Sequence, residues 1–285
     1  MADHVATLLV SCPDRKGLVA SLAQVLYGHG ANILDADQHT DPLAGMFFQR
    51  IRFDLSTLNT DRVALEHGLG EVASRSGMTW RLAYGQRRRR FAIFVSKYDH
   101  CLWDLLIRQQ AGELQGDVAM VVSNHADLAP VAAHFGVPFH HVPVTAATRA
   151  EQEPLQWKLL DDAGVELIVL ARYMQILTPA FVERYPHRII NIHHSFLPAF
   201  IGANPYRQAH ERGVKLVGAT AHYVTAQLDE GPIIEQGVTR CSHRDTVDDL
   251  VRKGRDLEKV VLAAAVRWHL DDRILTYANK TVVFD

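Results

Sequence analysis

The chain has 285 residues, with 30 basic and 32 acidic side chains and a formal net charge of −2. This balance gives no global attraction to nucleic acid or to an anionic membrane, so neither is an expected partner. The amino terminus lacks a basic segment followed by a long apolar run, and no apolar stretch reaches membrane-spanning length, which predicts a cytoplasmic protein. The three cysteines, Cys12, Cys101 and Cys241, are far apart, which argues against a disulfide framework.

The first 84 residues predict a small domain in which strands and helices follow the order βαββαβ. An apolar run leads into the turn Asp14-Arg15-Lys16-Gly17, and apolar residues at helical spacing follow until Gly28. This order suits a ferredoxin-like unit, with two helices on one face of an antiparallel sheet. We expect strands over 4–10, 32–39, 45–55 and 78–84, and helices over 18–28 and 60–75.

Residues 85–90, Gly-Gln-Arg-Arg-Arg-Arg, interrupt this pattern with polar and cationic side chains. Such a composition is typical of an exposed connector, so we place a linker here, between domains at 1–84 and 91–285. Contact of the arginine run with a polyanion is the alternative interpretation.

Beyond residue 90, short apolar strands alternate with helices. Near-continuous apolar strands of this kind indicate a mostly parallel sheet buried on both faces, so we predict a Rossmann-like α/β domain. The final helix, about 245–270, has a predicted buried stripe that includes Leu250, Val260 and Trp268. We expect strands over 91–95, 118–123, 138–141, 167–170, 188–193, 215–224 and 232–238, and helices over 101–110, 128–135, 151–162 and after Pro179.

Side chains suited to catalysis lie on two of the late strands. Because side chains alternate faces along a strand, Asn191 and His193 point to one side, and Thr220 and His222 share a side of a later strand. Asp229 follows in a loop, from which its carboxylate can reach a histidine across the crevice beyond the strand ends. A purely structural interpretation stays open, in which these groups satisfy loop backbone and Asp229 is an ordinary turn residue.

Other chemistries lack their sequence signals. The histidine pairs have no zinc-ligand spacing, so we predict no metal. Ser195 is not within a G-x-S-x-G turn, which disfavours a serine hydrolase. The loop after the strand at 91–95 reads Ser-Lys-Tyr-Asp-His-Cys, and its lack of glycine disfavours a dinucleotide cradle.

The segments NIHHSFLPAFIGANPY and GATAHYVTAQLDEGPIIEQ resemble the catalytic core of the folate-dependent formyltransferase family. LLVSCPDRKGLVASLAQVLYGHGANILDADQH resembles an ACT domain, and SKYDHCLWDLL resembles the start of the catalytic domain in the deformylases of that family. This resemblance covers nearly the whole chain and implies an ACT domain followed by a formyltransferase domain. It implies catalytic roles for Asn191, His193 and Asp229, and folate contacts at Met174, Gln175, Ile176, Leu177, Thr220 and His222.

The resemblance implies hydrolysis of 10-formyltetrahydrofolate to formate and tetrahydrofolate, which would supply formate for purine biosynthesis and balance one-carbon pools. The formylated folate is then the substrate, and no permanently bound cofactor is expected. The glycine-free loop departs from the phosphate loop of the related glycinamide ribonucleotide transformylases, which favours water as acceptor. The alternatives are transfer of the formyl group to an amine and a catalytically inactive amino-acid sensor.

The ACT-like segment implies an amino-acid effector, methionine or glycine. Its candidate binding residues are Asp14, Arg15, Lys16 and Gly17, which otherwise form a tight strand-to-helix turn. The resemblance also implies a homo-oligomer formed through the ACT domains.

Overall fold

The computed structural model describes residues 4–85, 88–145, 147–198 and 205–285. Two compact units divide the chain, and each is described by itself. The first unit comprises the chain up to residue 87 together with Asp271–Tyr277 and Val282–Asp285. The second comprises Arg88–Leu270 and Ala278–Thr281.

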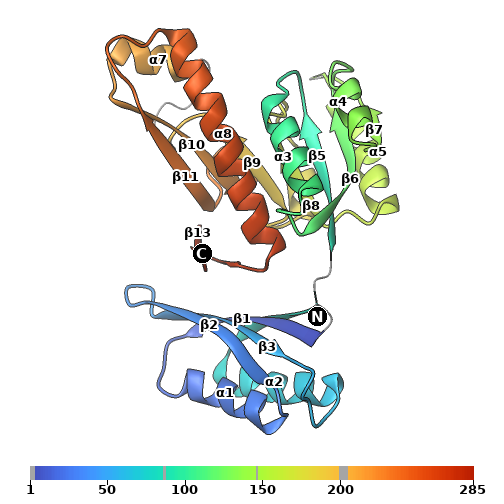
Figure 1. Cartoon of the computed structure of the whole chain (residues 1–285), viewed down its shortest axis with the longest axis vertical. Coiled ribbons are helices and arrows are strands. Elements are labelled where there is room, and N and C mark those ends of the chain that lie inside the picture. Colours follow the sequence, from blue (N-terminus) through green and yellow to red (C-terminus); the bar gives the residue numbers. More distant parts are fainter. Residues whose placement is uncertain (1–3, 86–87, 146, 199–204) are drawn as a thin grey trace. The chain divides into compact units, whose positions relative to one another are not determined.

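The first unit contains the predicted βαββαβ order. Its antiparallel sheet has the strand order β2-β3-β1-β4, and helices α1 and α2 cover one face (Figure 1). Leu8, Leu22, Phe53 and Leu69 from strands and helices meet in the core between them. The elements are β1 (Val5–Pro13), α1 (Leu18–Gly28), β2 (Asn32–Asp41), β3 (Met46–Asp54), α2 (Arg62–Ser76) and β4 (Thr79–Tyr84).

The end of the chain also packs on the first unit, whereas the sequence analysis assigned all of 91–285 to the second domain. Val282 and Phe284 form a small apolar cluster with Leu9 and Phe48 of the sheet. Strands β1 and β3 place large apolar side chains on both faces, and the helices cover only one. The carboxyl-terminal segment therefore covers apolar side chains that the helices leave open. It contains two short strands that the prediction missed, β12 (Ile274–Tyr277) and β13 (Lys280–Val283).

The second unit is the predicted α/β domain, built on a seven-stranded sheet of order β11-β10-β9-β8-β5-β6-β7. The strands from β7 to β9 are parallel, and β10 and β11 are antiparallel to their neighbours. Helix α8 packs against β10 and β11. The strands are β5 (Arg89–Val95), β6 (Gly116–Ser123), β7 (Phe139–His141), β8 (Leu167–Leu170), β9 (Ile189–His193), β10 (Leu216–Tyr223) and β11 (Ile233–Arg240). The helices are α3 (His100–Gln110), α4 (Ala129–His134), α5 (Arg149–Asp162), α6 (Pro179–Arg184), α7 (Pro205–Arg212) and α8 (Val247–Leu270).

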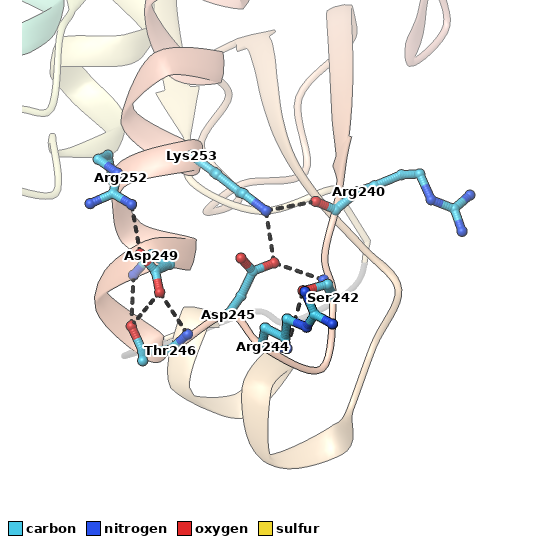
Figure 2. Close-up of polar contacts among 8 residues, drawn as sticks. All are labelled: Arg240, Ser242, Arg244, Asp245, Thr246, Asp249, Arg252 and Lys253. Carbon is cyan, nitrogen blue, oxygen red and sulfur yellow. Dashed lines mark hydrogen bonds and ion pairs between the residues drawn. The ribbon is translucent and has the colours of Figure 1, made fainter.

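Helix α8 begins with a reciprocal cap (Figure 2). The Asp249 carboxylate accepts hydrogen bonds from the backbone N–H and the hydroxyl of Thr246, at 2.9 and 2.8 Å, and the Thr246 hydroxyl accepts from the Asp249 N–H at 3.2 Å. Asp245, just before the helix, accepts from Lys253 and from the Ser242 N–H, both at 2.7 Å. These contacts satisfy amides that a helix start otherwise leaves unpaired, so they fix where α8 begins.

Two predicted boundaries shift. Gln86 and Arg87 of the predicted linker lie outside the described residues, and β5 already begins at Arg89. Helix α7 was not predicted, and residues 199–204 of the motif before it also lie outside the described part of the chain. No helix among the described residues is long and apolar enough to cross a membrane.

Candidate active site

Strands β9 and β10 bring four of the predicted site residues onto one sheet face. In their antiparallel register, Asn191 is opposite His222 and His193 is opposite Thr220. Residues two apart on a strand share a face, and directly opposed residues do so as well. The side-chain pairs predicted on each strand therefore lie on the same face. The Asn191 side-chain nitrogen is 3.3 Å from His222 Nε2.

The loop between β10 and β11 delivers Asp229 to this face. Asp229 has a φ of 56°, in the left-handed region that aspartate tolerates better than most residues. Two residues later, a Cβ on Gly231 would lie 1.7 Å from the backbone oxygen of Tyr223, so only glycine fits. The tight return places Asp229 Oδ2 at 3.3 Å from His193 Nδ1 and Oδ1 at 3.6 Å from His222 Nε2.

The carboxylate of Asp229 is held in its ionised form. Burial raises the pKa of Asp229, but hydrogen bonds and charge interactions with His193 and His222 outweigh that effect. The pKa therefore lies well below its usual value, and the group stays negative at neutral pH. A fixed negative charge beside a histidine ring favours its imidazolium form.

The contacts of the two histidines define which nitrogens are available. His222 Nδ1 faces the backbone oxygen of Tyr223 at 2.9 Å and therefore carries a hydrogen. His193 directs Nδ1 to Asp229, while its Nε2 is buried and has no hydrogen-bond partner among the described residues. An unpaired buried nitrogen in a polar cluster is a place where a substrate atom or a water is expected to bind.

Thr220 is fully buried and supports the loop after β9. Its hydroxyl donates to the backbone oxygen of Ser195 at 2.9 Å and accepts from the Leu197 N–H at 3.1 Å. Gln236 of β11, which the sequence analysis did not single out, donates to the same hydroxyl at 3.0 Å and to the Leu197 oxygen at 3.1 Å. Gln236 pairs directly with Thr220 across β10 and β11, a signal visible only once the register is known.

The predicted folate residues 174–177 lie in the segment between β8 and α6. Met174 and Ile176, two residues apart, are large apolar side chains that are 53% and 55% exposed. The Met174 N–H donates to the Ser96 hydroxyl at 2.9 Å, which ties this segment to the loop after β5. Gln175 is half-buried, and Leu177 packs against the main core of the second unit. The segment thus presents two exposed apolar side chains and is anchored through its backbone, and folate contact here stays a prediction.

The predicted effector residues form an exposed strand-to-helix turn in the first unit. Gly17 has a φ of 89°, and the Arg15 guanidinium donates to the backbone oxygen of Arg75 at 2.9 Å. The side chains of Asp14 and Lys16 are exposed. Effector binding at this turn stays a prediction.

A buried polar cluster beside the site escaped the sequence analysis. Glu258 of α8 is 1% exposed and accepts hydrogen bonds from Tyr206 at 3.0 Å and from His100 Nε2 at 2.8 Å. His194 stacks on His193, with ring centroids 5.2 Å apart, and burial together with nearby positive charge lowers the pKa of His194 to about 4. His194 is therefore neutral at physiological pH.

The same cluster contains the potential ligand set His100, Cys101 and Glu258, whose ligand atoms lie within 4.8 Å of one another. Both oxygens of Glu258 already accept hydrogen bonds, and the Arg172 guanidinium lies 3.6 Å from the carboxylate. Because a cation would have to displace these donors and sit beside a positive charge, the geometry does not fit a metal.

Comparisons with known proteins agree with this architecture. The formyl transferase family model matches residues 89–266, and the ACT domain model matches residues 6–74. A glycinamide ribonucleotide transformylase from Symbiobacterium toebii is 33% identical, with a TM-score of 0.66, over 72% of this chain and 98% of its own. The chain therefore consists of an ACT domain followed by a domain of the formyl transferase family.

Relatives that match the full chain narrow this class. A formyltetrahydrofolate deformylase from Synechocystis is 54% identical over 100% of both chains. The crystal structure of a formyltetrahydrofolate deformylase from Pseudomonas syringae has a TM-score of 0.95 at 45% identity, over 99% of this chain and 95% of its own. The chain belongs to the formyltetrahydrofolate deformylase family.

Proposed function

We propose that this protein hydrolyses 10-formyltetrahydrofolate to formate and tetrahydrofolate, using Asn191, His193 and Asp229. The observation that carries the proposal is that these three side chains come together on one sheet face, where the Nε2 of His193 is buried without a partner among the described residues. A role that only satisfies loop backbone does not account for a buried nitrogen without a partner. The family of the chain is consistent with this chemistry.

Asn191 is suited to stabilise the oxyanion that forms when water adds to the formyl carbon. The contact of 3.3 Å between the Asn191 side-chain nitrogen and His222 Nε2 holds the amide in place. This contact orients the amide and leaves its second N–H free for the substrate oxygen. A preorganised donor of this kind is typically worth about 10²- to 10³-fold in rate.

His193 and Asp229 are suited to move the protons. Asp229 fixes the ring through Nδ1, so Nε2 can take a proton from the attacking water and later deliver it to N10 of the folate. The bond between the formyl carbon and N10 then breaks, and N10 leaves as a neutral amine. The ionised Asp229 keeps the intermediate imidazolium stable, and no metal is required for any of these steps.

Met174 and Ile176 are suited to flank the pterin ring, with Gln175 and the segment backbone reading its edge. Thr220 and His222 then act on the reacting centre by fixing the loop after β9 and the Asn191 amide. No permanently bound cofactor takes part in this scheme. The proposal has three further parts. The released formate supplies purine synthesis, the effector is methionine or glycine, and the chain forms a homo-oligomer through its ACT domains.

The test is release of formate from 10-formyltetrahydrofolate by the purified protein without an amine acceptor. Wild type is compared with Asn191→Ala and with Thr225→Ser, a conservative change in the same loop as Asp229. We expect release to fall by about 10²-fold or more in Asn191→Ala and to persist in the control. Release only after an amine is added would make the protein a transferase, and no release under either condition would favour an inactive sensor.

A further inference from the structure

Arg172 has features that the proposed reaction scheme does not use. It lies just beyond β8 with a φ of 65°, a left-handed conformation that favours glycine. Its side chain is nevertheless only 10% exposed. A long cationic side chain at a buried position with a strained backbone indicates that the guanidinium itself is needed there.

Two groups hold the guanidinium and leave donors unused. Glu258 lies 3.6 Å from its Nε, and the ring of Tyr98 packs against it at 5.0 Å. Nε is buried and lacks a hydrogen-bond partner among the described residues. An arginine carries five N–H donors in a planar fork. The ion pair with Glu258 and the ring of Tyr98 therefore leave donors of Arg172 without hydrogen bonds.

The sheet register places Arg172 beside the catalytic strand. Leu170 of β8 pairs with Asn191 of β9 in parallel register. Arg172 and His193 each come two residues after this pair, so they occupy matching positions relative to the two strands. Its positive charge also acts on the buried ring of His194, which stacks on His193. The unused donors thus lie at the same edge of the sheet as the reacting centre.

We propose that Arg172 forms a subsite for a small carboxylate, which binds the formate released from the formyl group. This inference rests on the proposed function. In hydrolysis, the water oxygen bonds to the formyl carbon, the carbon–N10 bond breaks, N10 takes one proton, and the resulting acid loses another to become an anion. A planar guanidinium matches a planar carboxylate through two parallel hydrogen bonds.

Glu258 has a positioning role in this subsite. Burial raises the pKa of Glu258, but His100, Arg172 and Tyr206 outweigh that effect, so the carboxylate is ionised. It offsets the charge of Arg172 while the neutral formyl group is bound and lies nearest to its Nε, at 3.6 Å. The terminal nitrogens of the guanidinium are then available for the anionic product.

The first experiment measures product inhibition. Initial rates of tetrahydrofolate formation are followed at increasing sodium formate, with sodium chloride at equal ionic strength as reference. We expect the inhibition constant for formate to rise about tenfold or more in Arg172→Met, since a bidentate charge-assisted contact is lost. Arg255→Met is the matched control, because Arg255 also lies over Tyr98, at 5.5 Å. Its inhibition constant should match that of wild type, and an equal rise in both variants overturns the proposal.

A second measurement removes folate from the system. Broadening of the NMR signal of isotope-labelled formate reports binding to the wild type and should be lost in Arg172→Met. Arg172→Met removes a counter-ion of Glu258. If that variant fails to fold, the double variant Arg172→Met/Glu258→Gln, which removes both charges, is measured in place of the single variant. Wild type that hydrolyses the substrate without binding formate overturns the subsite alone. Formate binding without hydrolysis overturns the proposed function instead.

Discussion

The substitution Asp229→Asn tests the electrostatic core of the site with almost no change in side-chain shape. Asp229 lies 3.3 Å from His193 Nδ1 and 3.6 Å from His222 Nε2. At an effective dielectric of about 20, a carboxylate and an imidazolium at the shorter distance attract by about 5 kcal/mol. The amide oxygen of asparagine recovers about 1–2 kcal/mol as a neutral hydrogen bond. The remaining 3–4 kcal/mol corresponds to a loss of roughly 10²- to 10³-fold in kcat/KM.

The assay is formate release at neutral pH, with folding checked by far-UV circular dichroism. Glu230→Gln is the matched control, because Glu230 is the next residue of the same loop and is exposed. We expect Glu230→Gln to retain wild-type activity. A folded Asp229→Asn variant that keeps more than about a tenth of wild-type kcat/KM would refute the assigned role, since that loss is below 1.4 kcal/mol.

Three further outcomes follow from the structure. Because the folded pKa of Asp229 is depressed, its contribution to stability is present above the unfolded value of about 3.9. The difference in unfolding free energy between wild type and Asp229→Asn should therefore shrink as the pH falls below about 4, as measured by urea titration at several pH values. Gly231→Ala should lose activity at least as severely as Asp229→Asn, because the added Cβ meets the Tyr223 oxygen at 1.7 Å and the loop must move; wild-type formate release would contradict this. Phe284→Ala, which removes a side chain that is 5% exposed, should destabilise the first unit by about 3–5 kcal/mol in urea unfolding; an unchanged midpoint would show that the carboxyl-terminal cluster contributes nothing.

The order of elements could be predicted because its signals are local. Apolar spacing and turn residues lie within a few positions of the elements that they define, as at the turn before Leu18 and at the cap of α8. The pairing of side chains within the candidate site was only partly predictable. Alternation gave the common face of Asn191 and His193, but the contact of Asp229 with both histidines depends on a left-handed loop conformation that spacing does not reveal.

Long-range packing set the limit of the sequence analysis. Val260, predicted in the buried stripe of α8, is 57% exposed, whereas Glu258 in the same helix is 1% exposed. Hydrophobicity ranks these two residues in the wrong order because Glu258 is buried through partners from α3, α7 and the end of β8. The two final strands were missed for the same kind of reason, since their apolar partners lie more than 200 residues earlier in the chain.

In the proposed scheme, the carboxylates of Asp229 and Glu258 allow one site to hold a neutral formyl group and then an anionic product. Asp229 offsets the positive charge that His193 acquires when it takes a proton, so the pair is then neutral overall. Glu258 offsets Arg172 in the resting state. In that scheme each cationic group has a carboxylate partner, and the hydrogen-bond donors of Asn191 and Arg172 are left for the oxygen atoms that become negative. Removing either carboxylate would leave a buried cation uncompensated, which is why both are expected to affect product release as well as the chemical step.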